Sequence, residues 1–301
     1  MTYVLKLAAV LLLCATLHAQ SALIPAAISQ DPAPDKANPA SLQTFQLPSH
    51  GTLLNAFVYV AAGAGAHRTV ILLHGFPGNE RNLDLAQSIR RAGWNVLYFD
   101  YRGSWGSPGA FSFSNALEDT QSAIAFLRDP TNAAKLHSDP SYIVLIGHSM
   151  GGLMAYYSTA HDPAIRAIGV FSATDINSGP LSALKPEQQA QAVPRLAHAL
   201  ADEGLAPLAG CTPESLAQDV IDHATEWSAV NLAPKLAPRP ALIITSDDGL
   251  APLNDAVAAV LRKAGDQHVT TLHLTTDHSY SGQRIALEAA VLAFLATLPQ
   301  K

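Results

Sequence analysis

Charged residues are scarce in this chain of 301 residues: Asp, Glu, Lys and Arg make up only 14%, and the net charge is −6. Binding to nucleic acids or to anionic membranes usually depends on clusters of Lys and Arg on one surface. The sequence contains no such basic cluster, so we expect neither kind of partner. With 49% hydrophobic residues, the chain has enough apolar material for one large globular core.

Cysteine is scarce as well, with Cys14 and Cys211 as its two examples. Residues 1–19 have the features of a secretory signal peptide, because Lys6 precedes an apolar block that runs from Leu7 to Leu17. This block is shorter than the about 20 apolar residues of a membrane span, so we expect no stable membrane insertion and a periplasmic or secreted location. Removal of the signal peptide would leave Cys211 alone, which excludes an internal disulfide and predicts an ordinary buried thiol.

Residues 20–43 are rich in Ala, Pro and Ser and predict a flexible leader, followed by one domain over residues 44–301. Two short extended runs, residues 44–47 and 55–60, flank Ser49-His50-Gly51 and predict an antiparallel hairpin at one edge of a sheet. From Thr69 onward, predicted strands and helices alternate, which indicates an α/β fold with a mostly parallel, doubly wound sheet. The predicted strands are residues 70–73, 95–99, 143–146, 168–171, 241–245 and 269–275, and the predicted helices are 83–92, 116–128, 253–264 and 284–298.

One long segment, from Asp175 to Pro240, interrupts this alternation. Scattered prolines divide it into short helical pieces such as 194–204 and 213–223. An insertion of this length between neighbouring strands, without a strand of its own, predicts a helical cap at about 175–240 over the carboxyl edge of the sheet. In that position the cap would shape a substrate pocket.

The most informative stretch is Gly147-His148-Ser149-Met150-Gly151-Gly152, which follows a β-branched run and precedes a helix-like segment. The G-x-S-x-G spacing alone arises easily by chance, but a buried strand before it and a helix after it form the context that the motif requires. Glycines are needed at Gly147 and Gly151 because neighbouring chain must pass close to a strained serine. Ser149 is therefore the candidate nucleophile.

A serine hydroxyl needs a base that takes its proton, and the chain offers 12 histidines. His278 follows the last predicted strand, which would put it at the carboxyl edge of the sheet beside Ser149. His74 and His161 are its closest competitors. His148 adjoins the serine, but adjacent residues leave a tight turn in different directions, so we expect it to pack or hydrogen-bond locally.

An acid should orient the histidine, and Asp247 and Asp248 come directly after the predicted strand 241–245. One of them would hold the histidine tautomer and stabilise the imidazolium, for which it must be ionised. The residues alone leave open which of the two does so, and whether both belong to a solvated turn. Asp175, which follows the preceding strand, is the next candidate.

Backbone N–H groups must face the oxyanion of a tetrahedral intermediate. Met150 would offer one at the start of the helix, and Phe76 another in the loop His74-Gly75-Phe76-Pro77-Gly78, unless that loop is only a tight turn. Aromatic residues in the loop from Asp100 to Phe113 could wall an acyl pocket or serve structural packing. No H-E-x-x-H or comparable ligand spacing occurs, so we expect neither a metal nor another cofactor.

From Thr44 to Pro299 the chain resembles the α/β-hydrolase superfamily. The segments that carry the resemblance are the loop at 74–78, Asp100-Tyr101-Arg102-Gly103 and the turn around Ser149, together with the order Ser, Asp, His. The acid of that family commonly stands four residues before a proline in a D-x-x-V-P turn. This matches Asp248 and Pro252, with alanine in place of the valine, and favours Asp248 over Asp247.

The segment His278-Ser279-Tyr280-Ser281-Gly282 is further similar to small bacterial carboxylesterases and to single-domain relatives of the prolyl oligopeptidase catalytic domain. The resemblance implies a serine hydrolase that forms an acyl-enzyme on Ser149, with His278 as base and Asp248 as orienting acid. A small ester is the expected substrate, and a short peptide or amide is the alternative. A binding protein that has kept the fold without turnover is a third possibility.

Overall fold

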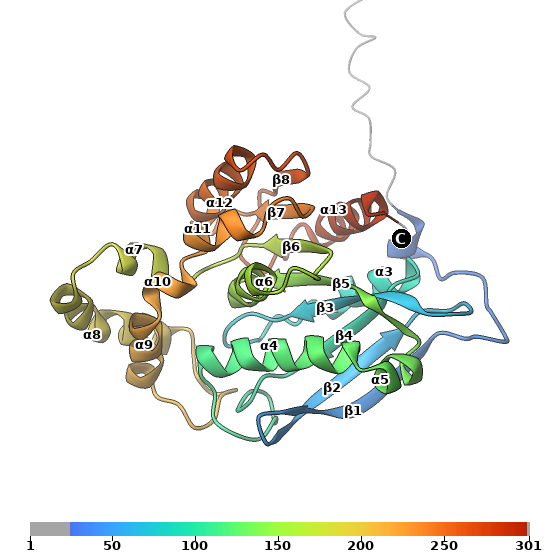
Figure 1. Cartoon of the computed structure of the whole chain (residues 1–301), viewed down its shortest axis with the longest axis horizontal. Helices are drawn as coiled ribbons and strands as arrows, with labels where there is room; N and C mark the ends of the chain where they lie inside the picture. Colours follow the sequence, from blue (N-terminus) through green and yellow to red (C-terminus); the bar gives the residue numbers. More distant parts are fainter. Residues whose placement is uncertain (1–24, 300–301) are drawn as a thin grey trace, which may run out of the picture.

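The computed structural model describes residues 25–299, and the signal peptide predicted for residues 1–19 lies outside them. One sheet of eight strands runs through the molecule in the order β1-β2-β4-β3-β5-β6-β7-β8 (Figure 1). Only the two pairings that involve β2 are antiparallel. The strands are β1 Ser41–Ser49, β2 Thr52–Val60, β3 His67–Leu73, β4 Asn95–Phe99, β5 Ser138–His148, β6 Ala167–Phe171, β7 Ala241–Thr245 and β8 Val269–His273.

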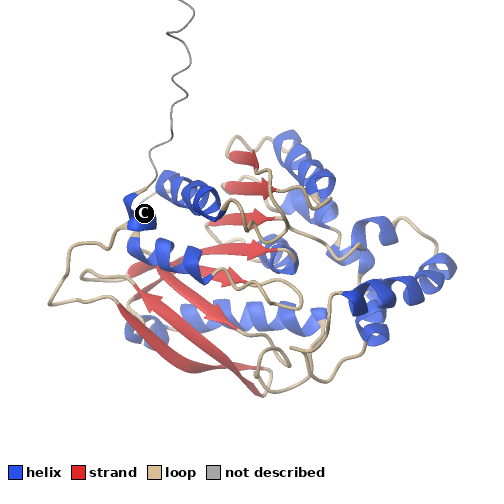
Figure 2. Ribbon diagram, turned by 180° about the vertical axis from the view of Figure 1, so that it is seen from behind, coloured by secondary structure: helices blue, strands red, loops and turns tan. Residues whose placement is uncertain are grey.

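Helices cover both faces of this sheet, which confirms the predicted doubly wound α/β class (Figures 1 and 2). Apolar side chains of α4, α6 and α12 pack on one face, and those of α3 and α13 on the other. Each face thus buries the continuous apolar runs of the central strands, as parallel sheets require. The helices outside the insertion are α2 Ala26–Ser29, α3 Leu83–Arg91, α4 Phe113–Arg128, α5 Pro130–Lys135, α6 Met150–His161, α12 Ala251–Lys263 and α13 Arg284–Thr297.

The segment from 175 to 240 contains helices and no strand, and it extends beyond the sheet at one end of the molecule (Figure 1). Its first part, α7 to α9, stands away from the sheet, whereas α11 contacts α6 and α12. Its elements are α7 Ser178–Ser182, α8 Pro186–Asp202, α9 Pro213–Asp222, α10 Ala224–Trp227, α11 Ala229–Leu232 and the 3₁₀ turn η1 Ala233–Lys235. From here on, residues 175–240 are called the insertion, and the name cap is kept for its helices α7 and α8 alone.

The predicted hairpin at the sheet edge is present, but both of its strands are longer than expected. β1 begins at Ser41, because Ser41 pairs with Val60, so the leader predicted for residues 20–43 ends earlier. His50 and Gly51 form the turn with positive φ angles of 44° and 79°, as two-residue hairpin turns require. Part of the leader also touches the domain, since Arg91 donates a hydrogen bond to the Ile28 carbonyl at 3.0 Å.

Candidate active site

Ser149 lies on the sharp turn between β5 and α6, with φ 55° and ψ −120°. A positive φ is strained for a residue with a Cβ, and such strain persists only where the surroundings enforce it. Two backbone hydrogen bonds enforce it here. The Ser149 N–H donates to the Phe171 carbonyl at 3.1 Å, and the Thr174 N–H donates to the Ser149 carbonyl at 3.1 Å. The turn therefore holds the serine at the carboxyl edge of the sheet.

The glycines of the motif meet a steric requirement. A Cβ on Gly147 would lie 2.0 Å from the carbonyl oxygen of Gly151, and a Cβ on Gly151 would lie 2.1 Å from that of Leu73. Both distances are far below a van der Waals contact and both involve backbone atoms that cannot move aside. The close approach predicted from the sequence is thus present on both sides of Ser149.

His278 follows β8 and donates a hydrogen bond from Nδ1 to Oδ2 of Asp248 at 2.8 Å. The Asp248 side chain is only 5% exposed. The neighbouring Asp247 points elsewhere: its carboxylate is 52% exposed and accepts from Nε2 of His273 at 3.0 Å. Asp175 accepts hydrogen bonds from backbone N–H groups inside the insertion. Of the three candidate acids, only Asp248 contacts His278.

Opposing effects act on the charge of Asp248. Burial by itself would raise the pKa of this carboxyl, but hydrogen bonds from His278, from the hydroxyls of Ser172 and Ser246 and from the Leu250 N–H hold the pKa well below its ordinary value. The Leu250 bond to Oδ1 is 2.9 Å long. Asp248 is therefore ionised at neutral pH, as a group that stabilises an imidazolium must be.

A buried chain of hydroxyl groups near Asp248 was not foreseen from the sequence. Ser172 Oγ lies 2.9 Å from Ser246 Oγ and 2.9 Å from the Tyr280 hydroxyl, which donates to the Ile244 carbonyl. The only signal was that Ser246 and Tyr280 stand within two residues of Asp248 and His278. These contacts join the ends of β6 and β7 to the loop that carries His278.

His148 is buried and packs locally, as expected, with its ring stacked on Phe171 at a centroid distance of 4.9 Å. Its hydrogen bond, however, is not local: Nε2 donates to the backbone carbonyl of His278 at 2.9 Å. Burial, and then the nearby His278, lowers the pKa of His148 to about 3, so the ring is neutral at physiological pH. A neutral donor beside the nucleophile therefore fixes the main chain of His278.

The loop from His74 to Gly78 passes directly over Ser149, because a Cβ on Gly75 would lie 3.0 Å from the Ser149 Cβ. Among the described residues, neither the Phe76 N–H nor the Met150 N–H donates to another protein group. Both donors predicted for the oxyanion thus lie next to Ser149 and remain available. The other competing base, His74, is buried and donates from Nδ1 to the Gly75 carbonyl at 2.8 Å.

Aromatic residues of the following loop support Phe76 from behind. Phe111 and Phe113 are buried, with ring centroids 5.8 and 5.4 Å from that of Phe76. Trp105 donates from Nε1 to the Pro77 carbonyl at 3.0 Å. Of the two roles considered for these aromatics, structural packing is the one observed.

A cavity of about 410 Å³ brings the candidate residues together, since Phe76, Ser149, Asp248 and His278 all line it. A smaller cavity of about 140 Å³ is lined by Phe76, Ser149 and His278 as well. Glu203, at the end of α8, lines both. The cap therefore contributes to the walls around Ser149.

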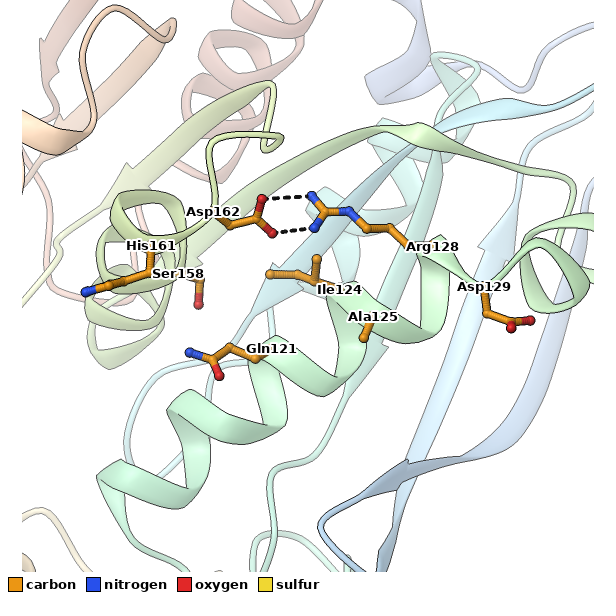
Figure 3. Close-up of a pocket in the computed structure, with 8 residues that line it drawn as sticks. All are labelled: Gln121, Ile124, Ala125, Arg128, Asp129, Ser158, His161 and Asp162. Atoms are coloured by element: carbon orange, nitrogen blue, oxygen red, sulfur yellow. Dashed lines mark hydrogen bonds and ion pairs between the residues drawn. The ribbon is translucent and has the colours of Figure 1, made fainter.

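Another hollow, of about 620 Å³, lies between α4 and α6 (Figure 3). Arg128 and Asp162 face each other there in a bidentate ion pair of 2.5 and 3.1 Å, which satisfies both charges. His161 also lines it and bonds from Nδ1 to the Tyr157 carbonyl at 2.8 Å. His161 is the last residue of α6 and Ser149 directly precedes the first, so the length of the helix separates them. Ser149 does not line this hollow, and the cavities that it does line are the candidate active site.

Two buried histidines should make folding sensitive to acid. Burial lowers the pKa of His74 to about 4 and that of His148 to about 3. The unfolded chain takes up these protons at about pH 6.5, so the stability they contribute is complete above that pH and is lost as pH falls below it. Asp100 opposes part of the loss, because burial raises its pKa to about 6 and protonation then favours the folded state.

From pH 7 to pH 5 we expect the free energy of unfolding to fall by about 2 kcal/mol from these three groups, as measured by urea denaturation. His148→Gln keeps a hydrogen-bond donor and removes one titrating ring, so the fall should become smaller. An equal fall in wild type and variant would show that His148 is not the buried neutral group described above.

Within residues 25–299, no cluster of three or more His, Cys, Asp or Glu side chains is arranged to hold a metal ion. None of the helices in the same range combines the length and the apolar character that crossing a membrane requires. Cys211 is half-buried, and burial raises the pKa of its thiol.

A model of the alpha/beta hydrolase family matches residues 70–295. The uncharacterised protein YfhR of Escherichia coli O157:H7 is 35% identical over 103 residues, which are 33% of this chain and 34% of that protein. The uncharacterised protein Rv2307c of Mycobacterium tuberculosis is 28% identical over 106 residues, which are 35% and 36% of the two chains. These alignments span about a third of the length of the curated relatives.

Solved structures show the same fold at low identity. The thermophilic carboxylesterase EstE1, cloned from a metagenomic library, superposes with a TM-score of 0.59 and 19% identity over 91% of this chain and 92% of that one. Est1E from Butyrivibrio proteoclasticus, solved with ferulic acid bound, gives a TM-score of 0.63 and 18% identity over 85% and 100% of the two chains. Likeness at this level of identity concerns the fold alone.

Proposed function

The chain belongs to the alpha/beta hydrolase family, and from this premise we propose that it is a serine hydrolase that cleaves small carboxylic esters through an acyl-enzyme on Ser149. The observation that carries the proposal is the 2.8 Å hydrogen bond between His278 and Asp248 at a cavity that Ser149 also lines. The similar fold of the carboxylesterase EstE1 supports this choice of substrate.

In the first half of the reaction, His278 Nε2 takes the proton of the Ser149 hydroxyl while Oγ attacks the ester carbonyl. Asp248 keeps the proton of His278 on Nδ1 and stabilises the imidazolium. The N–H groups of Phe76 and Met150 donate to the oxyanion of the tetrahedral intermediate. His278 then protonates the leaving alcohol, which departs and leaves the acyl group on Ser149.

In the second half, His278 takes a proton from water as the water attacks the acyl carbonyl, and it returns the proton to Ser149 when the acid leaves. His148 takes no part in these transfers, because its pKa of about 3 keeps it neutral. Its bond to the His278 carbonyl would keep the loop of the base in place through both halves.

A fluorophosphonate probe, which reacts with activated serines, tests the proposal. We expect the wild type to be labelled and Ser149→Ala to remain unlabelled. Ser158→Ala is a matched control, because Ser158 is a buried serine of α6 that lines the hollow of Figure 3, and it should be labelled like the wild type. A folded wild type that does not react would contradict catalysis, and labelling of Ser149→Ala would assign the nucleophile elsewhere.

A further inference from the structure

An apolar groove lies between α7 and α8 of the cap and has a volume of about 440 Å³. Its walls include Leu181, Leu184, Ala192 and Leu196, and Arg195 is the one charged side chain in its lining. Leu181 and Leu196 are 7% and 6% exposed, whereas Leu184 at 37% is among the few large apolar side chains that face solvent. We call this space the cap groove.

The cap groove adjoins the 410 Å³ cavity at Ser149. Asn177, Leu196 and Ala199 line both spaces, so the two share a wall formed by α8 and the residue before α7. Leu200, which is buried, adds a further apolar group on the Ser149 side. On the α8 side this shared wall is apolar, so an alkyl chain attached to a group at Ser149 would follow Leu196 and Ala199 toward the cap groove.

The space on the side of the 140 Å³ cavity has a different character. It is much smaller, and its lining includes the carboxylates of Glu80 and Glu203 and the side chain of Asn79. A long alkyl chain would gain little there, because it would face polar groups that prefer water. The two sides of Ser149 thus differ in size, and only the larger one shares lining residues with the apolar cap groove.

Resting on the proposed function, we propose that the substrate is an ester with one long unbranched alkyl chain, which binds in the cap groove, and a small group on its other side. The chain removes apolar surface from water at both partners, which is the main source of affinity in such grooves. Each methylene that reaches the groove should raise kcat/KM by up to about fourfold. The catalytic groups carry out the hydrolysis, and the cap groove determines which esters are preferred.

Three esters, followed by titration of the released acid below the concentration at which they aggregate, test this proposal. We expect ethyl octanoate or octyl acetate to exceed ethyl acetate in kcat/KM by at least about tenfold. The faster of the two long esters tells whether the acyl or the alcohol half carries the chain. Equal kcat/KM for all three esters would overturn the cap groove as a binding site while leaving the hydrolase proposal intact.

Variants of the cap test whether the preference for long esters arises in the cap groove. Ala192→Trp fills the cap groove and should lower the ratio of long-ester to short-ester kcat/KM by about tenfold or more. Ala190→Trp on the same helix is the control, because Ala190 is exposed and lines neither space, and it should leave the ratio unchanged. Leu184→Ser at the exposed rim should lower the ratio without disturbing the fold.

The failure of this proposal differs from that of the proposed function. A protein that hydrolyses no ester and does not react with the fluorophosphonate would contradict both. A protein that reacts with the probe and prefers long esters equally in wild type, Ala192→Trp and Leu184→Ser would show that the chain binds outside the cap groove, and would overturn the inference alone.

Discussion

Replacing Asp248 by asparagine is expected to lower kcat for ester hydrolysis by about 10⁴-fold. The carboxylate accepts the Nδ1–H of His278 at 2.8 Å, which keeps Nε2 free to take the serine proton. An amide can turn its NH₂ toward Nδ1 and so favour the wrong tautomer, and it carries no charge to stabilise the imidazolium. Steady-state kinetics on a short ester measure the loss.

Asp247→Asn is the matched control for this experiment. It makes the same chemical change one residue away, but the carboxylate of Asp247 is half exposed and bonds to His273 instead. Exposed pairs of this kind contribute little, so kcat should stay within about twofold of wild type. If Asp247→Asn lost as much activity as Asp248→Asn, or if Asp248→Asn stayed within about tenfold of wild type, Asp248 would not be the orienting acid.

The residues alone could not predict which of these two aspartates contacts His278. Both follow β7, and composition and strand position place both at the correct edge of the sheet. Only the resemblance of the segment from Asp248 to Pro252 to a family turn favoured Asp248. The physical reason lies in the path of the turn, in which Gly249 adopts a φ of 84° and the two side chains point in different directions. A linear sequence does not specify such directions.

For some strands that are short apolar runs between turn residues, the bounds were predicted correctly. β4 and β7 have the expected bounds, because each is a short apolar run between turn residues. β5 begins five residues earlier than its predicted start at residue 143, at Ser138. The extra residues are mostly polar, and Ser138 pairs with His67, so this part of the strand depends on its neighbour and not on its own composition.

The insertion was predicted as helical, but its longest helix begins eight residues before the predicted start at Pro194. α8 runs from Pro186 to Asp202 and contains Pro194, where the sequence predicted a helix start. Proline normally ends a helix because it lacks an N–H and its ring crowds the preceding turn. Pro194 is exposed, and the buried side of α8 is formed by Leu196, Ala197 and Leu200. Tertiary packing therefore outweighs the local preference here.

Hydrogen bonds between side chains far apart in the sequence could not be predicted. The bond from His148 to the His278 carbonyl joins residues 130 positions apart, and that between Ser172 and Tyr280 spans 108. Histidine and serine occur throughout the chain, so residue type alone does not identify such pairs. The role of Ala192 in the cap groove could not be predicted for the same reason, because an alanine lines a groove only where other segments pack around it.

Replacing Arg102 by alanine is expected to lower the free energy of unfolding by about 3 to 5 kcal/mol, measured by urea denaturation. Arg102 is buried and donates from Nε to Oδ1 of Asp119 at 2.7 Å, while its backbone N–H donates to Oδ2 at 2.8 Å. Its guanidinium also bonds to the Asn115 carbonyl at 3.0 Å. Without Arg102, the fully buried carboxylate of Asp119 would lose the one positive partner that it has among residues 25–299, and it would keep its desolvation cost.

Arg128→Ala is the matched control, because Arg128 and Asp162 also form a close ion pair but are 33% and 22% exposed (Figure 3). Water screens such a pair, so its loss should cost about 1 kcal/mol or less. Combining Arg102→Met with Asp119→Leu should restore much of the stability lost in Arg102→Ala, since no unpaired charge then remains in the core. If Arg102→Ala cost no more than Arg128→Ala, burial would not be what makes the Arg102–Asp119 pair important, and the loop that supports Phe76 would owe its stability to the packing of Phe111 and Phe113.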